Sequence, residues 1–260
     1  MLAIAAAPQR RLLPAGDLTF LASAGEDGVV RLWEVTRVNR ETKAREVRSL
    51  AGHTGAVTSV SFAPDGIVLA SGGSDGTVRL WDAVTGEERG RLRAHAGEVT
   101  SVIWADGNTV VSAGADGTIR FWTVSLGKDE LVLQAHQGAV RDLALSEDGK
   151  LLASAGDDGL VKLWSVAEGR TSVRTGKLLR TLRGHQGAVR SVAIQSDAKT
   201  LVSGGADGTV RVWMTATGEL ARTLGGHAAV ESVALSWSHI ASGGVDGTVK
   251  LWSIYNGLEL

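Results

Sequence analysis

The sequence contains the three residue types of a hydrolytic triad within a short segment. His53, Ser71 and Asp75 carry the functional groups of a general base, a nucleophile and an orienting carboxylate. In such a triad the imidazole takes the proton of the serine hydroxyl, and the carboxylate holds the imidazole in the required tautomer. The first question that the sequence raises is therefore whether the protein is a hydrolase.

The same residue types recur along the chain, which favours a structural role over catalysis. Catalysis needs one such site, whereas a repetitive scaffold needs one stabilising set in each repeat. In every copy the serine precedes the aspartate by four residues, and a tryptophan follows the aspartate by six. The five sets are His53, Ser71, Asp75 and Trp81; His95, Ser112, Asp116 and Trp122; His136, Ser154, Asp158 and Trp164; His185, Ser203, Asp207 and Trp213; and His227, Ser242, Asp246 and Trp252.

Short strands and tight turns are the elements that must position these sets. The dipeptide Asp-Gly between two apolar runs is typical of a tight hairpin, since glycine adopts positive φ without a steric cost. A single small sheet cannot bury both of its faces, whereas sheets arranged radially can, so the repeat favours an all-β propeller. In the repeat that begins near His53, apolar runs predict four strands, at 57–63, 67–73, 77–83 and 89–95.

A further motif connects these repeats with a known family. Gly-His or Ala-His dipeptides precede the Asp-Gly and Trp elements of five repeats, at 52–53, 94–95, 135–136, 184–185 and 226–227. Over essentially its whole length the chain resembles the WD-repeat β-propeller family, although only Asp82 supplies the aspartate that the family places after tryptophan. The resemblance implies one domain over 1–260, a six-bladed propeller of four-stranded antiparallel blades. The expected blades are approximately 1–52, 53–94, 95–135, 136–184, 185–226 and 227–260.

The resemblance also implies a role for the five sets. In this family the tryptophan N–H is bonded to the serine hydroxyl, the serine to the histidine and the histidine to the aspartate. The donor and acceptor groups of the four side chains agree with such a chain of hydrogen bonds. We therefore expect a structural network in each set, and no catalytic residue, metal ligand or cofactor. Blade 1 has Ser23, Asp27 and Trp33 but no histidine, and in blade 6 the segment after Gly-His is one residue shorter than in blade 2. We therefore expect these two blades to be the less stable ones.

The last repeat is shorter than the others. Aligned with 213–227, the segment 252–260 stops where a fourth strand would only be starting. The last blade is therefore expected to lack most of its outer strand. Two alternatives remain open, a six-bladed ring with an unlatched seam or a piece of a longer polypeptide that has a seventh blade.

The family typically binds proteins or peptides through the loops before the first strand and between the second and third strands. At those positions the chain lacks the aromatic side chains that dominate many interfaces. Arg141 and Arg190 lie on adjacent blades, either as two solvated side chains or as a site for an acidic peptide or a phosphate. The candidate partner-binding residues are Arg141, Arg190, Asp157, Glu98, Thr58 and Glu231.

Two basic segments, 36–49 and 167–177, are expected to be long loops at the other end of the blades. Glutamates interrupt them and no aromatic residue is present to stack on a base, so solvated loops are favoured over a nucleic-acid site. Among the tryptophans outside the five sets, Trp104 is expected in the core and Trp237 on the surface.

Overall composition sets the remaining limits. The chain has 27 basic and 28 acidic residues and no cysteine. With so small a net charge, no overall electrostatic attraction to nucleic acid or to a membrane surface is expected. No apolar run reaches the roughly 18 residues of a membrane helix. We therefore expect a cytoplasmic protein.

These observations favour a non-catalytic scaffold that binds a protein or peptide, as a monomer or as part of a longer chain. The alternative is the sensor or docking portion of a longer bacterial signalling protein, of the kinase or NTPase type. A propeller hydrolase or lactonase would need acids or histidines outside the repeats that converge on the central channel. Of the histidines, only His239 lies outside the five sets.

Overall fold

The computed structural model describes residues 3–8, 17–38, 41–166 and 175–260. These residues form twenty-three strands in six antiparallel sheets, and the fold class is the predicted all-β, six-bladed propeller. The chain divides into two compact units, one of Met1–Asp116 with Arg120–Val132 and one of Gly117–Ile119 with Leu133–Leu260. No helix of the described residues is long and apolar enough to cross a membrane.

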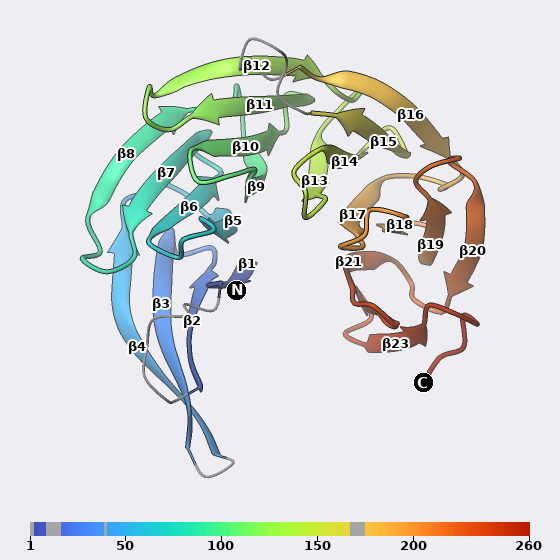
Figure 1. The fold of residues 1–260 in the computed structure, drawn as a ribbon, viewed down its shortest axis with the longest axis horizontal. Coiled ribbons are helices and arrows are strands. Elements are labelled where there is room, and N and C mark those ends of the chain that lie inside the picture. The colour runs from blue at the N-terminus through green and yellow to red at the C-terminus, as the bar shows by residue number, and fades with distance from the viewer. Residues whose placement is uncertain (1–2, 9–16, 39–40, 167–174) are drawn as a thin grey trace. The chain divides into compact units, whose positions relative to one another are not determined.

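The first unit contains two complete sheets and most of a third, and the strands of each sheet follow one another in chain order (Figure 1). The first sheet consists of β1 (Ala3–Ala6), β2 (Asp17–Ala24), β3 (Val29–Val38) and β4 (Glu41–Ala51). The second consists of β5 (Val57–Phe62), β6 (Val68–Gly73), β7 (Thr77–Asp82) and β8 (Glu88–Arg93). The third consists of β9 (Val99–Trp104), β10 (Thr109–Gly114), β11 (Thr118–Thr123) and β12 (Lys128–Gln134).

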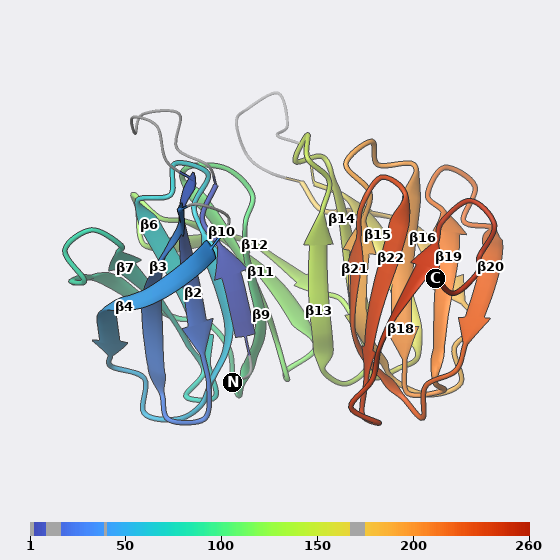
Figure 2. The same cartoon turned by 90° about the horizontal axis from the view of Figure 1, so that it is seen from below.

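The second unit contains the last three sheets, whose neighbouring strands run antiparallel, as β21 and β22 do in Figure 2. The fourth sheet consists of β13 (Val140–Leu145), β14 (Leu151–Gly156), β15 (Leu160–Ser165) and β16 (Lys177–Arg183). The fifth consists of β17 (Val189–Ile194), β18 (Thr200–Gly205), β19 (Thr209–Met214) and β20 (Leu220–Gly225). The sixth consists of β21 (Val230–Leu235), β22 (His239–Gly244) and β23 (Val249–Ser253).

The sixth sheet lacks its fourth strand, as the sequence predicts. After β23 the chain turns back at Gly257, where a positive φ of 73° favours glycine. Only a short stretch then pairs with β23: Ser253 N–H donates to the carbonyl of Leu258, and Leu260 N–H donates to that of Leu251, both at 2.9 Å. The outer edge of β23 before Leu251, at Val249 and Lys250, has no strand beside it among the described residues.

The core lies between neighbouring sheets, where apolar side chains of the strands meet. Four tryptophans of the sets pack against the preceding sheet, Trp81, Trp122, Trp213 and Trp252. Trp81, for example, clusters with Ala22 and Leu32. Trp104 is buried in the cluster that joins the second and third sheets, which confirms its predicted place in the core.

The prediction of a loop at 36–49 is wrong. β3 and β4 form a long hairpin in this region, with Thr36 opposite Lys43 in the register. One basic residue of this segment pairs across the hairpin, because Arg45 lies opposite Glu34 and their side chains approach to 2.6 Å. Of the second basic segment, residues 167–174 lie outside the described part, and β16 begins at Lys177.

A close approach between sheets explains a glycine on β6. A Cβ atom added to Gly72 would lie 2.6 Å from Cγ1 of Val99, on the first strand of the next sheet. Gly90, on β8, is a matched control, since an added Cβ would meet no atom within 4 Å. We expect Gly72→Ala to lower the free energy of unfolding by about 1–3 kcal/mol through overpacking. Gly90→Ala is expected to be neutral or slightly stabilising, since glycine weakens a strand.

Urea denaturation of the two glycine variants and the parent chain measures these differences. An equal change in both variants would mean that the spacing between the second and third sheets does not restrict the residue at 72.

Candidate functional site

The second blade shows the arrangement of one set of four side chains. The histidine lies in the loop before β5, the serine on β6, the aspartate in the turn after β6 and the tryptophan on β7. Trp81 Nε1–H donates to Ser71 Oγ at 2.8 Å, and His53 Nε2 lies 2.8 Å from the same oxygen. His53 Nδ1 lies 3.1 Å from both carboxylate oxygens of Asp75. The four side chains thus form one continuous chain of hydrogen bonds.

The other four sets repeat this geometry. In them the serine oxygen lies 2.8–2.9 Å from histidine Nε2 and 2.9–3.0 Å from the tryptophan nitrogen. Histidine Nδ1 lies 2.8–3.0 Å from the carboxylate in the third, fourth and fifth blades, and 3.3 Å in the sixth. The structure therefore brings together Ser112, His95, Asp116 and Trp122; Ser154, His136, Asp158 and Trp164; Ser203, His185, Asp207 and Trp213; and Ser242, His227, Asp246 and Trp252.

Two blades differ from this pattern. In blade 1 Trp33 donates to Ser23 at 2.8 Å, but Asp27 is bonded to Arg31 at 2.6 Å instead of an imidazole. In blade 6 the Asp246 side chain is 28% exposed, whereas the four other network aspartates are 9–15% exposed. The longer bond to His227 and this exposure make the sixth network the looser one among the five.

Which group donates and which accepts in each network follows from the charge of its aspartate. Burial by itself would raise the pKa of Asp75, but hydrogen bonds from Thr77, the Thr54 amide and His53 outweigh burial and lower the pKa to about 2. The ionised carboxylate can only accept, so the imidazole donates from Nδ1 and accepts the serine proton at Nε2. The serine oxygen then accepts from the indole, and every polar group of the set has a partner.

The imidazoles of four networks are neutral in the folded protein. Burial lowers the pKa of each below its ordinary value of 6.5, and the hydrogen bond that each imidazole donates to its aspartate opposes this shift only in part. Removal of the imidazole from water disfavours its charged form. The histidines with a lowered pKa are His53, His95, His136 and His185.

The networks contain the hydrogen bonds of a hydrolytic triad, but their serines are not exposed to a substrate. Ser71, Ser112, Ser154 and Ser203 have no exposed surface, and Ser242 is 1% exposed. Each hydroxyl oxygen, the atom that would attack a substrate, already accepts the indole N–H. In the described part of the chain, no group of three or more histidine and acidic side chains could hold a metal ion.

Four of the candidate partner-binding residues form ion pairs with one another in the second unit. Arg141 donates from Nε and Nη2 to the two carboxylate oxygens of Asp157, at 2.6 and 2.7 Å. Arg190 pairs with Glu231 of the next sheet. The hydrogen bond from Arg141 lowers the pKa of Asp157, and the charge of Arg190 adds to this effect. We call these four residues, whose side chains are 31–47% exposed, the charged patch.

The remaining two candidates lie in the first unit. The hydroxyl of Thr58 donates to the carbonyl of Gly72 at 3.0 Å and also contacts the carbonyl of Val99, so it links backbone groups of two sheets. Glu98 is half-buried, and its carbonyl accepts from Ala115 N–H at 2.9 Å. Thr58 and Glu98 therefore do not belong to the charged patch.

Sequence reasoning missed a set of polar links between first strands. Asp142 Oδ2 accepts from the hydroxyl of Ser191 at 2.9 Å and from the Val192 N–H at 3.0 Å. The hydroxyl oxygen of Ser191 accepts in turn from Val233 N–H at 3.1 Å, so β13, β17 and β21 are connected (Figure 1). The polar residue at the third position of each first strand, directly before apolar residues, was the signal that could have indicated these links.

Comparison with known families agrees with this geometry. The family described as WD domain, G-beta repeat matches the chain in six segments, at residues 11–34, 44–82, 86–123, 127–165, 176–214 and 218–253. No curated protein matches the chain.

Proposed function

Since the chain belongs to the WD domain, G-beta repeat family, we propose that it is a non-catalytic scaffold that binds another protein or a peptide. WD-repeat propellers are typical protein-interaction scaffolds. The observation that carries the non-catalytic assignment is the complete burial of the serine hydroxyls, whose oxygens are occupied by indole N–H groups. A nucleophile must reach its substrate, so these serines stabilise the blades and do not react.

The charged patch is the proposed contact surface. Each arginine already has an acidic partner, so the patch carries two positive and two negative charges and no excess of either. This arrangement argues against a simple phosphate site, which needs uncompensated cations. It suits a partner segment that presents both an acidic and a basic side chain, since complementary charges at an interface provide specificity.

A charge reversal on this surface tests the proposal. In the variant R141E/R190E four acidic side chains would lie together, and we expect affinity capture from the source cell to lose the partner. The matched control is Arg91→Glu, an exposed position on β8 outside the patch. A partner that both variants retain would contradict the charged patch as the contact. The absence of any partner for the parent chain would contradict the scaffold itself.

Three further expectations stay predictions. The cytoplasmic location can be tested by fractionation of the source cell. The predicted monomer can be tested by light scattering, which reports the molar mass in solution. The alternative function, part of a longer bacterial signalling protein, can be tested by reading the gene on either side of the coding segment.

A further inference from the structure

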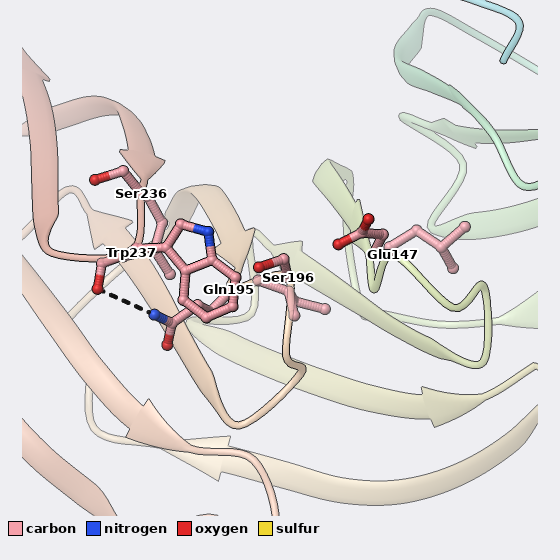
Figure 3. A pocket seen from close by; sticks show the side chains of 8 residues that line it. Glu147, Gln195, Ser196, Ser236 and Trp237 are labelled. Carbon is pink, nitrogen blue, oxygen red and sulfur yellow. Dashed lines mark hydrogen bonds between the residues drawn. The ribbon is translucent and has the colours of Figure 1, made fainter. Parts of the chain in front are cut away.

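A pocket of about 370 Å³ lies in the second unit, where the first strands of the last three sheets end (Figure 3). Leu145, Ile194 and Leu235, the final residues of β13, β17 and β21, line it with aliphatic side chains. The rest of the lining comes from the loops that follow these strands. The charged patch involves Arg141, Arg190 and Glu231 near the starts of the same strands, so the pocket is a different surface.

The pocket presents an exposed aromatic ring. Trp237 is 65% exposed, as the sequence predicts, whereas the tryptophans of the five networks are buried. Its backbone is held in place, because the side-chain amide of Gln195 donates to its carbonyl at 3.3 Å. Among the described residues no group is bonded to its indole nitrogen. An exposed indole beside a cavity offers a flat apolar surface that attracts cations through its π-electrons.

The pocket also presents an acidic group without a basic partner. Glu147 is exposed, lines the pocket and forms no ion pair within the described ranges. The two lysines of the adjacent loops are paired elsewhere, Lys150 with Asp148 and Lys199 with Asp197, each at 3.7 Å. No basic side chain lines the pocket. The pocket therefore attracts positive charge.

The remaining polar atoms of the lining include further acceptors. Because Gln195 uses its amide N–H for the Trp237 carbonyl, its amide oxygen stays available as an acceptor. Figure 3 shows the Trp237 ring and Glu147 on opposite sides of Ser196, with the Gln195 amide beside the Trp237 carbonyl. An occupant would thus meet a ring at one end, a carboxylate at the other and acceptor atoms along the way.

We propose that this pocket binds an arginine side chain of a partner protein. The aliphatic stem lies against the indole of Trp237, and the guanidinium pairs with the carboxylate of Glu147. Pockets that bind small ligands begin at roughly 300 Å³, so the volume is sufficient for one long side chain. The inference rests on the proposed function as a scaffold and names the chemistry of a second contact on it.

Arginine fits these groups better than lysine does. The guanidinium is planar, has five N–H donors and no acceptor, and stacks on aromatic faces. It can therefore reach Glu147 and an additional acceptor at the same time. A lysine ammonium is a compact and strongly hydrated charge, so it loses more hydration free energy than a guanidinium does on entering such a pocket.

Nuclear magnetic resonance of the full ¹⁵N-labelled chain tests the proposal with small probes. Loss of one indole N–H signal in Trp237→Phe assigns the Trp237 signal. Titration with N-acetyl-arginine methylamide is expected to shift this signal saturably, with a Kd on the order of 1 mM. The citrulline analogue, which has almost the same shape but no charge, is expected to produce no saturable shift. The lysine analogue is expected to bind roughly tenfold more weakly than the arginine probe.

Two variants test the carboxylate. Glu147→Gln is expected to weaken binding of the arginine probe roughly tenfold. Glu130→Gln, at an exposed acid on β12, is the matched control and is expected to bind as the parent does. The indole signals of the network tryptophans, which depend on their serine bonds, show in the same spectra whether each variant is folded.

Several outcomes would overturn the proposal. A Trp237 signal that does not respond to the arginine probe would exclude the site, and equal binding of the citrulline analogue would exclude charge recognition. Equal binding of the lysine analogue would exclude the preference for a guanidinium, and unchanged binding by Glu147→Gln would exclude the pairing. If the parent chain captures no partner while the arginine probe still binds, the scaffold function is contradicted and the chemistry of the pocket stays supported, so the two proposals can fail separately.

Discussion

Replacement of Asp75 by alanine is expected to lower the free energy of unfolding by about 1–3 kcal/mol, because it leaves buried donors without an acceptor. The Asp75 carboxylate accepts from His53 Nδ1–H, from the hydroxyl of Thr77 at 2.7 Å and from the Thr54 N–H at 3.0 Å. The His53 side chain has no exposed surface, so water cannot replace the lost bond. Equilibrium urea denaturation of the variant and the parent chain measures the loss.

Blade 1 contains a matched control for this substitution. Asp27 occupies the same position of the repeat, but it is bonded to Arg31 and its side chain is 48% exposed. Asp27→Ala leaves no buried imidazole unpaired, and we expect a much smaller loss than for Asp75→Ala. If the two variants lost equal stability, the turn itself would account for the effect and the network would not.

A steep loss of stability is expected as the pH falls below about 6.5. His53, His95, His136 and His185 have pKa values below 6.5 in the folded chain, because burial disfavours the imidazolium. Below pH 6.5 the unfolded chain therefore binds more protons than the folded chain, and stability decreases as the pH falls towards the folded-state pKa values. One full proton corresponds to about 1.4 kcal/mol per pH unit, so the four imidazoles set an upper limit of about 5.6 kcal/mol per pH unit.

A second acid transition follows from the carboxylates. The pKa values of Asp75 and Asp207 are lowered to about 2, although burial alone would raise them, because hydrogen bonds to these carboxylates favour the charged form. Their contribution to stability is complete above the ordinary pKa of 3.8 and is lost as the pH falls towards 2.

Urea denaturation at closely spaced pH values between 8 and 2 would resolve both transitions. In His53→Asn the slope below pH 6.5 is expected to decrease, by at most one proton. His239→Gln is the control, since His239 is exposed and lies outside the networks, and the parent slope is expected to remain. A stability that is constant between pH 7.5 and 5 would contradict the neutral, buried state of the four imidazoles.

Much of the fold could be predicted because its signals are local. The spacing of Ser71, Asp75 and Trp81 specifies a strand, a tight turn and a second strand, and those elements form within one hairpin. Six copies of the segment then define six sheets, and the short last copy indicates a sheet without its fourth strand. The hairpin at β3 and β4 was missed because its charges were read as a solvated loop, while their pairing depends on the register between two strands.

The sequence by itself determined which residues recur, and recurrence distinguishes a structural set such as His53, Ser71 and Asp75 from a catalytic one. Only the tertiary structure decided what lies beside residues that occur once. Arg190 neutralises Glu231 on another sheet, and Trp237 shares a pocket with Glu147, although ninety positions separate the last two in the chain. Such neighbours depend on how sheets pack against one another, and side-chain packing between sheets leaves no periodic signal in the order of the residues.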